Sequence, residues 1–159
     1  MMAAGRADKP TPDTLDAMVR PFVHRLRVRY AECDLQGVVF NAHYMTYLDE
    51  TMTELWRQSV GGGYQDMVAA GTDMVVAEAH LRFRSPARFD EELAIEAQTT
   101  RLGTTGMTTD LRIARGKETL LEAELRHVFV ATDGSGKVPI PDDVRRGLLP
   151  NLRPEAVSA

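Results

Sequence analysis

The sequence predicts an α+β domain in which a five-stranded antiparallel sheet wraps around one long central helix. Five segments alternate apolar and polar residues with the period of two that is typical of half-buried strands. Between the first and the second of them, a longer segment repeats apolar residues every three to four positions, as an amphipathic helix does. A sheet and a helix that each have one apolar face can bury both faces only if the sheet curls around the helix.

Composition limits the classes of protein to which this chain can belong. Its 159 residues carry a formal net charge of -4, which provides no general cationic field for nucleic acid. No apolar run approaches the ~20 residues that span a bilayer, and the start of the chain lacks the continuous apolar stretch of a signal peptide. The single cysteine, Cys33, cannot form an internal disulfide or a multi-thiolate metal site. We therefore expect a cytoplasmic protein that binds neither nucleic acid nor a membrane.

The prolines mark the limits of a single domain. They gather at positions 10, 12 and 21 and again at 139, 141, 150 and 154, whereas only Pro86 interrupts the middle of the chain. We expect an N-terminal arm over residues 1–21, a folded domain over residues 22–150, and a C-terminal tail over residues 151–159. The apolar pattern places the core between Phe22 and Ala131.

The first strand and the helix adjoin one short loop. Alternation runs from His24 to Ala31 and predicts the first strand. The helical periodicity begins after Asn41, whose side chain suits the N-cap, and three glycines at 61–63 suit the helix end. A second short helix is expected from Tyr64 to Ala70.

Four more strands follow the helices. The alternating runs cover residues 75–83, 93–97, 107–113 and 121–129. Short connections at Pro86, at Gly103 to Gly106 and at Gly116 favour antiparallel neighbours throughout. Such a sheet has exposed edges, which a homo-oligomer joined edge to edge would cover. Alternatively, the edge is protected by its own charges, for which His80, Arg82 and Arg84 are suited.

The loop between the first strand and the helix contains the residue with the clearest chemical potential, Asp34. It lies a few residues before the helix start, where unpaired backbone N–H groups and the positive end of the helix dipole are presented. A carboxylate beside fixed N–H donors is the minimum requirement for acyl transfer. The alternative is an aspartate that closes an Asx turn or caps the helix, which is the commoner role. The residues alone favour that alternative, although Asn41 is better placed to cap.

A family resemblance reverses this preference. The run Asp34-x-x-Gly37-x-Val39-x-Asn41-Ala42-x-Tyr44 resembles the signature of hotdog-fold acyl-CoA thioesterases of the 4-hydroxybenzoyl-CoA thioesterase-like group. The basic, proline-containing segment at residues 83–93 resembles a second landmark of that group. The resemblance implies a hotdog fold, homodimers that share one continuous sheet and often pair into homotetramers, and active sites at the subunit interface.

The resemblance also implies roles for individual residues. Asp34 would be the nucleophile or general base, and the backbone N–H of Asn41 would polarise the thioester carbonyl, so position 41 should be more sensitive to proline than to alanine. The substrate-binding candidates are Gly37, Val39 and Tyr44 at the pocket and Arg84 and Arg88 for the CoA phosphates. The expected reaction is hydrolysis of an acyl-CoA to a carboxylic acid and CoA.

Other assignments follow from the remaining polar residues. Coenzyme A is part of the substrate, so no cofactor is expected, and the histidines are too scattered for a metal site. Glu32 is expected to pair with an arginine of the first strand, and Asp49 or Glu50 on the helix is either a second acid or base or simply solvated. Two other functions stay open, an enoyl-thioester hydratase, which the absence of histidine at Val39 disfavours, and a non-catalytic acyl-CoA-binding module.

Overall fold

The computed structural model describes residues 20–154. Its elements are the strands β1 (Phe22–Arg27), β2 (Thr72–Phe83), β3 (Glu92–Leu102), β4 (Gly106–Arg115) and β5 (Glu118–Ala131), the helices α2 (Asn41–Ser59), α3 (Gly63–Ala69) and α4 (Asp142–Leu148), and two 3-10 turns, η1 (Tyr30–Glu32) and η2 (Leu149–Asn151). All five predicted strands and both predicted helices are present. Residues 1–19 of the expected arm and 155–159 of the expected tail lie outside the described range.

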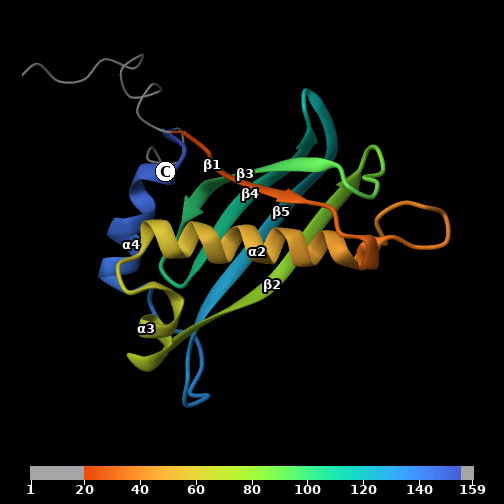
Figure 1. Ribbon diagram of the computed structural model, residues 1–159. Helices are drawn as coiled ribbons and strands as arrows, with labels where there is room; N and C mark the ends of the chain where they lie inside the picture. The colour runs from red at the N-terminus through yellow and green to blue at the C-terminus, as the bar shows by residue number, and fades with distance from the viewer. Residues whose placement is uncertain (1–19, 155–159) are drawn as a thin grey trace, which may run out of the picture.

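The strands form one antiparallel sheet in the order β1-β3-β4-β5-β2, and α2 runs across its concave face (Figure 1). The helix buries Tyr47, Leu48, Leu55 and Trp56 against the inward residues of the sheet. Replacing such large core side chains with alanine typically costs ~3–5 kcal/mol. The predicted arrangement, a sheet curled around one central helix, is confirmed.

The strand order corrects one sequence prediction. The Pro86 connection does not join neighbours, because β2 lies at one edge of the sheet and β3 lies beside β1 near the other (Figure 1). At each end, its backbone bonds to a distant segment: Arg84 N–H donates to Leu120 O at 2.8 Å, and Asp90 N–H donates to Val28 O at 3.1 Å. The connection is therefore a crossover held at both ends, not a hairpin.

Two further strand predictions differ in detail. The first strand ends at Arg27 rather than Ala31, because residues 30–32 form the 3-10 turn η1. In β2 a bulge between Val76 and Glu78 shifts the alternation. Val76 pairs with buried His127, so Val75, expected on the core face, points to the opposite side.

The chain stays packed on the sheet beyond residue 131. Val144 and Leu148 of α4 belong to the buried core, which therefore extends past the limit predicted at Ala131. Asn151, where a tail was expected to begin, is buried, and its side-chain Oδ1 accepts a hydrogen bond from Thr99 N–H on β3 at 2.8 Å. Within the described range, no helix is both long and apolar enough to cross a membrane.

Candidate active site

The loop that carries Asp34 is a tight, internally bonded turn. Asp34 N–H donates to Val38 O at 2.9 Å, and Gly37 N–H donates to Asp34 O at 3.0 Å. Gly37 has a φ of +74°, a backbone conformation that side chains disfavour, although a Cβ there would meet no atom within 4 Å. Gly37 is thus required for its backbone conformation rather than for space.

The carboxylate of Asp34 has two different oxygens. Oδ1 accepts a hydrogen bond from Gln36 N–H at 2.8 Å, which is the Asx turn of the structural alternative. Among the described residues, no donor bonds to Oδ2. Asp34 is also only half-buried. The turn therefore fixes the orientation of the carboxylate and leaves one oxygen available for chemistry.

The helix start differs by one residue from the prediction. The N-cap is Phe40, with φ −64° and ψ 137°, and Asn41 is the first helical residue without a side-chain capping bond. The capping role expected of the Asn41 side chain is therefore wrong, because Asn41 is itself the first residue of the helix and not the residue before it. Within residues 20–154, the N–H groups of Asn41 and Ala42 donate to no backbone carbonyl, as expected in a first helical turn. These amides remain available to an oxygen of a ligand.

A buried acid, Glu32, ties this loop to the helix. Tyr47 on α2 donates its hydroxyl to Glu32 Oε2 at 2.6 Å, and Arg29 donates its backbone N–H to the same oxygen at 2.8 Å. The Arg29 guanidinium completes the group with an ion pair of 2.6 Å, which confirms the expected pairing of Glu32 with an arginine. Burial works to raise the pKa of Glu32, but the hydrogen bonds from Tyr47 and Arg29 hold it below its usual range. Sequence reasoning missed Tyr47, which the apolar periodicity assigns only to the core.

The proline-containing segment at residues 83–93 packs directly on the run from Asp34 to Tyr44. Val39 N–H donates to Ala87 O at 2.9 Å, and Ala87 N–H donates to the Tyr44 hydroxyl at 2.9 Å. The Phe83 ring stands edge-on to Tyr44, with ring centroids 5.4 Å apart. Burial raises the pKa of Tyr44. Val39 and Tyr44 are each only 2% exposed, so in the single chain both side chains pack in the core beneath the Asp34 loop.

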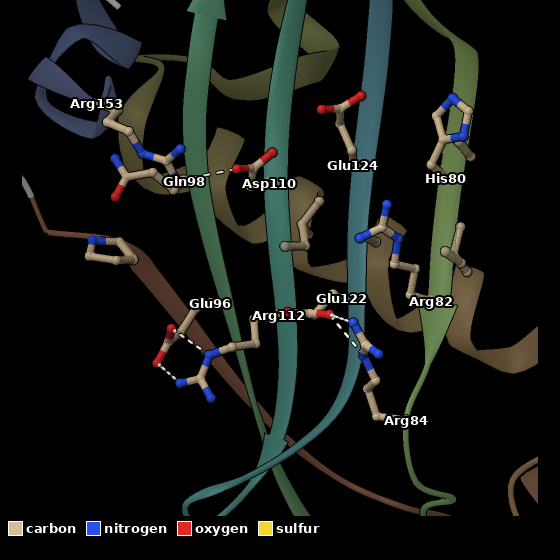
Figure 2. Close-up of a pocket in the computed structure, with 15 residues that line it drawn as sticks. His80, Arg82, Arg84, Glu96, Gln98, Asp110, Arg112, Glu122, Glu124 and Arg153 are labelled. Carbon is tan, nitrogen blue, oxygen red and sulfur yellow. Dashed lines mark hydrogen bonds and ion pairs between the residues drawn. The ribbon is translucent and has the colours of Figure 1, made fainter. Parts of the chain in front are cut away.

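The two arginines expected to bind CoA phosphates lie in different settings. Arg84 donates two hydrogen bonds to Glu122, at 2.9 and 2.7 Å, beside a hollow of about 1050 Å³ on the sheet face opposite α2 (Figure 2). Charged side chains of β2 to β5 fill that face (Figure 2). Arg88 is exposed and directly follows Ala87, on the turn that touches the Asp34 loop. Arg88 is therefore closer in the fold to the candidate chemistry than Arg84.

A second, smaller cavity of about 210 Å³ lies between α2, α3, β2 and β5. Asp49 and His127 line it, whereas Glu50 pairs with His24 at 3.1 Å. Neither hollow borders Asp34. Sequence reasoning set His127 aside as one scattered histidine, although a polar residue within the apolar series of β5 was a signal that something polar faces the core. Residues 20–154 contain no group of three potential metal-binding side chains.

Comparisons with known proteins agree with this arrangement. The model of the thioesterase superfamily matches residues 36–122, more than half of the 159 residues, and begins two residues after Asp34. The acyl-CoA thioester hydrolase YbgC of Escherichia coli O6:H1 is 32% identical over 106 residues, which cover 66% of this chain and 78% of that protein.

Solved structures give the same result for the fold. Protein TT1821 of Thermus thermophilus has a TM-score of 0.73 and 32% identity, covering 79% of this chain and 95% of that one. Protein AQ1494 of Aquifex aeolicus has a TM-score of 0.76 and 26% identity, covering 80% of this chain and 99% of that one. The chain belongs to the thioesterase superfamily, which confirms the resemblance, the hotdog fold and the enzyme class, thioester hydrolase, that the sequence predicted.

Proposed function

We propose that this protein hydrolyses an acyl-CoA thioester to a carboxylic acid and free CoA, with Asp34 as nucleophile or general base. One observation carries the proposal. The carboxylate of Asp34 is oriented by Gln36 N–H on a loop that leads directly into a helix whose first amides have no backbone acceptor among the described residues. The relative YbgC, named an acyl-CoA thioester hydrolase, supports CoA as the carrier.

In the proposed reaction, the negative Asp34 carboxylate starts the attack on the thioester, and the positive end of the helix stabilises the negative charge that forms on the carbonyl oxygen. Asp34 Oδ2 attacks the thioester carbon or takes a proton from the water that attacks it. The carbonyl oxygen becomes negative and accepts hydrogen bonds from the Asn41 and Ala42 amides, where the helix dipole favours an anion. The C–S bond then breaks. If Asp34 acts as the base, the proton that it took from water passes to the leaving sulfur. If Asp34 acts as the nucleophile, the thiolate takes a proton from water and a further water hydrolyses the acyl–Asp34 anhydride, so both routes end with a carboxylic acid, CoA thiol and a free Asp34 carboxylate. No cofactor takes part beyond the CoA of the substrate.

We also propose that the site is completed by a second copy of the chain. The 12-residue strand β2 is a sheet edge, and Val75, Val76 and Phe83 on it are 45%, 45% and 52% exposed. A long edge strand with exposed apolar residues is normally paired or covered. Antiparallel pairing of two β2 strands around a twofold axis would join both sheets and place the start of one β2 beside the end of the other. Two such dimers would form the expected homotetramer.

The decisive test of the activity uses a variant that keeps the turn. Asp34→Asn retains an oxygen for Gln36 N–H but lacks the negative charge, so the loop should fold as before. Release of free thiol from a panel of acyl-CoAs measures the rate. We expect the wild type to hydrolyse at least one of them and Asp34→Asn to be slower by about 10²-fold or more. Equal rates for both proteins on every substrate would show that Asp34 is not the reactive group.

A proline substitution tests the oxyanion donor separately. Asn41 is the first helical residue, where proline is tolerated, and the extended backbone of Phe40 suits a residue that precedes proline. Asn41→Pro therefore deletes one N–H without breaking the helix. We expect a rate loss of about 10²–10³-fold for Asn41→Pro and a much smaller one for Asn41→Ala. If both variants lose the same activity while their circular dichroism is unchanged, the side chain and not the amide of Asn41 is responsible.

A further inference from the structure

Arg115, the last residue of β4, binds the crossover between β2 and β3. Its Nη1 donates to both carboxylate oxygens of Glu91, at 2.6 and 2.7 Å, and lies 3.5 Å from the carbonyl oxygen of Pro86. Its Nη2 donates to Glu118 Oε2 at 2.5 Å. The side chains of Arg115 and Glu91 are only 33% and 22% exposed. Because two carboxylates already share this guanidinium, its contacts serve the protein itself and do not leave it free for a phosphate.

Glu91 in turn holds a tight turn over residues 88–91. Its Oε2 accepts a hydrogen bond from Arg88 N–H at 2.9 Å, and its backbone O accepts one from Val28 N–H at 3.0 Å. Within this turn Asp90 has a φ of +67°, in the left-handed region that residues other than glycine seldom occupy. A backbone in such a conformation persists only where its surroundings hold it. The turn therefore depends on the groups bonded to it, among them the Glu91 carboxylate that Arg115 holds.

The residue just before this turn, Ala87, joins the crossover to the Asp34 run. Ala87 is fully buried, and its two backbone groups bond to different parts of that run. Its O accepts the Val39 N–H and its N–H donates to the Tyr44 hydroxyl, each at 2.9 Å. Val39 ends the loop that carries Asp34, whereas Tyr44 is the fourth residue of α2. A shift of Ala87 would therefore move the end of the loop relative to the start of the helix.

We propose that Arg115 and Glu91 are positioning residues of the thioesterase reaction. They hold the 88–91 turn, the turn holds Ala87, and Ala87 keeps the Asp34 carboxylate in place relative to the first amides of α2. Between residues 20 and 154, neither side chain bonds to Asp34 or to those amides, so the effect passes through the backbone. A displacement of about 1 Å between reacting groups can slow a reaction by about 10²-fold. The inference rests on the proposed function, in which the carboxylate and the amides act on one carbonyl group.

Steady-state kinetics distinguish positioning from substrate binding. Arg115→Met keeps an apolar stem but lacks the guanidinium, and the variant should fold because ion pairs with this degree of exposure contribute little to stability. On an acyl-CoA that the wild type hydrolyses, we expect kcat to fall about 10- to 100-fold while KM stays within about threefold. An unchanged kcat overturns the proposal. A rise in KM alone also overturns it, because the pair would then serve substrate binding, for example through Arg88.

Arg112→Met is the matched control on the same strand. Arg112 also binds one carboxylate through two nitrogens, that of Glu96 at 3.1 and 2.7 Å, and its side chain is 38% exposed. This pair, however, lies on the sheet face opposite α2 (Figure 2). The kcat of Arg112→Met should therefore stay within about twofold of the wild-type value. Equal losses for Arg112→Met and Arg115→Met would reveal a general effect of β4 on the fold and would overturn the proposal.

Amide hydrogen exchange measured by NMR tests the structural link without any substrate. The Val39 amide is bonded to Ala87 O, so its exchange rate reports whether the crossover still holds the loop. Arg115→Met should speed this exchange about tenfold or more, and Arg112→Met should leave it unchanged. Unaltered exchange at Val39 in Arg115→Met overturns the proposal even if kcat falls, since the lost activity would then have another cause.

A double variant tests whether the two residues act as one unit. Glu91→Gln keeps an oxygen for the Arg88 N–H but lacks the charge that pairs with Arg115. Combined with Arg115→Met, it should lose no more kcat than the more damaging single variant, whereas losses that multiply would overturn the proposal. The outcomes also separate the two levels of inference. If Asp34→Asn hydrolyses as fast as the wild type, the proposed function fails and this inference fails with it, whereas hydrolysis that depends on Asp34 but not on Arg115 removes only the positioning role.

Discussion

The hydrogen bond between Tyr47 and Glu32 gives a sharp test of how the Asp34 loop is held. Tyr47→Phe deletes only the hydroxyl that donates to Glu32 Oε2 at 2.6 Å, while the ring stays in the core. Tyr47 is fully buried and Glu32 is 6% exposed, so water cannot easily replace the lost donor. Glu32 still accepts the backbone N–H of Arg29 and keeps its ion pair with the Arg29 guanidinium.

The size of the effect follows from these remaining partners. A hydrogen bond to a charged group contributes ~1.5–3 kcal/mol to stability. Because Arg29 keeps Glu32 from becoming an unpaired buried charge, we expect the lower half of that range, ~1.5–2 kcal/mol off the free energy of unfolding. For a domain of this size the melting temperature should fall by roughly 4–7 °C.

The pH dependence of this loss has a definite sign. The pKa of Glu32 is lower in the folded protein than in the unfolded chain, so its ionised form contributes stability above the unfolded pKa, and the contribution disappears as pH falls through the folded pKa. Tyr47→Phe removes one of the donors that lower this pKa. The stability difference between wild type and variant should therefore be constant near neutral pH and shrink below about pH 4.

Urea unfolding at several pH values measures these quantities. Tyr30→Phe is the matched control, because Tyr30 is 80% exposed and its ring stands edge-on to Phe89. Its effect should stay within about 0.5 kcal/mol. A Tyr47→Phe protein as stable as the control at neutral pH, or a difference that grows in acid, would refute the idea that this hydrogen bond holds the loop.

Two other substitutions test the turn and the chain end. Gly37→Ala should lower the free energy of unfolding by ~1–2 kcal/mol through its φ of +74° alone, since the added Cβ meets no atom within 4 Å; an unchanged urea midpoint would show that the turn relaxes. Asn151→Ala should cost ~2–4 kcal/mol, because Thr99 N–H and Ala97 O on β3 lose their buried partner; a thermal scan that shows no shift would mean that water replaces the amide.

The periodicity of apolar residues predicted the secondary structure correctly wherever burial alone decides it. In β3, Leu93, Ile95 and Ala97 are buried and the residues between them are more exposed, as predicted, and α2 buries the apolar face that its spacing defines. Asp34 also lies in the predicted place, because the loop is anchored by the strand before it and the helix after it.

The sequence predictions that were wrong share a physical cause: the structure at those places depends on contacts between residues far apart in sequence. The first strand ends early because Glu32 folds back onto Arg29 and reaches Tyr47, fifteen residues later. The strand order differs from the prediction because the Pro86 connection bonds at one end to Leu120 on β5 and at the other to Val28, just after β1. His127 could be recognised as a cavity residue only once β2 and α2 were placed above it. Apart from the Arg29–Glu32 pair, which is three residues apart, none of these contacts can be recognised in a short window of sequence.

The crossover between β2 and β3 also bears on the order in which the molecule forms. The strands β3, β4 and β5 follow one another as a meander of short hairpins, whereas β1 and β2 must find partners about 70 and 50 residues away. Local pairings cost less chain entropy, so the meander is the natural nucleus and the two outer strands dock later. The Asp34 loop is assembled from the segments that arrive last. A weakened chain should therefore lose the structure of the Asp34 loop while most of its sheet is still intact.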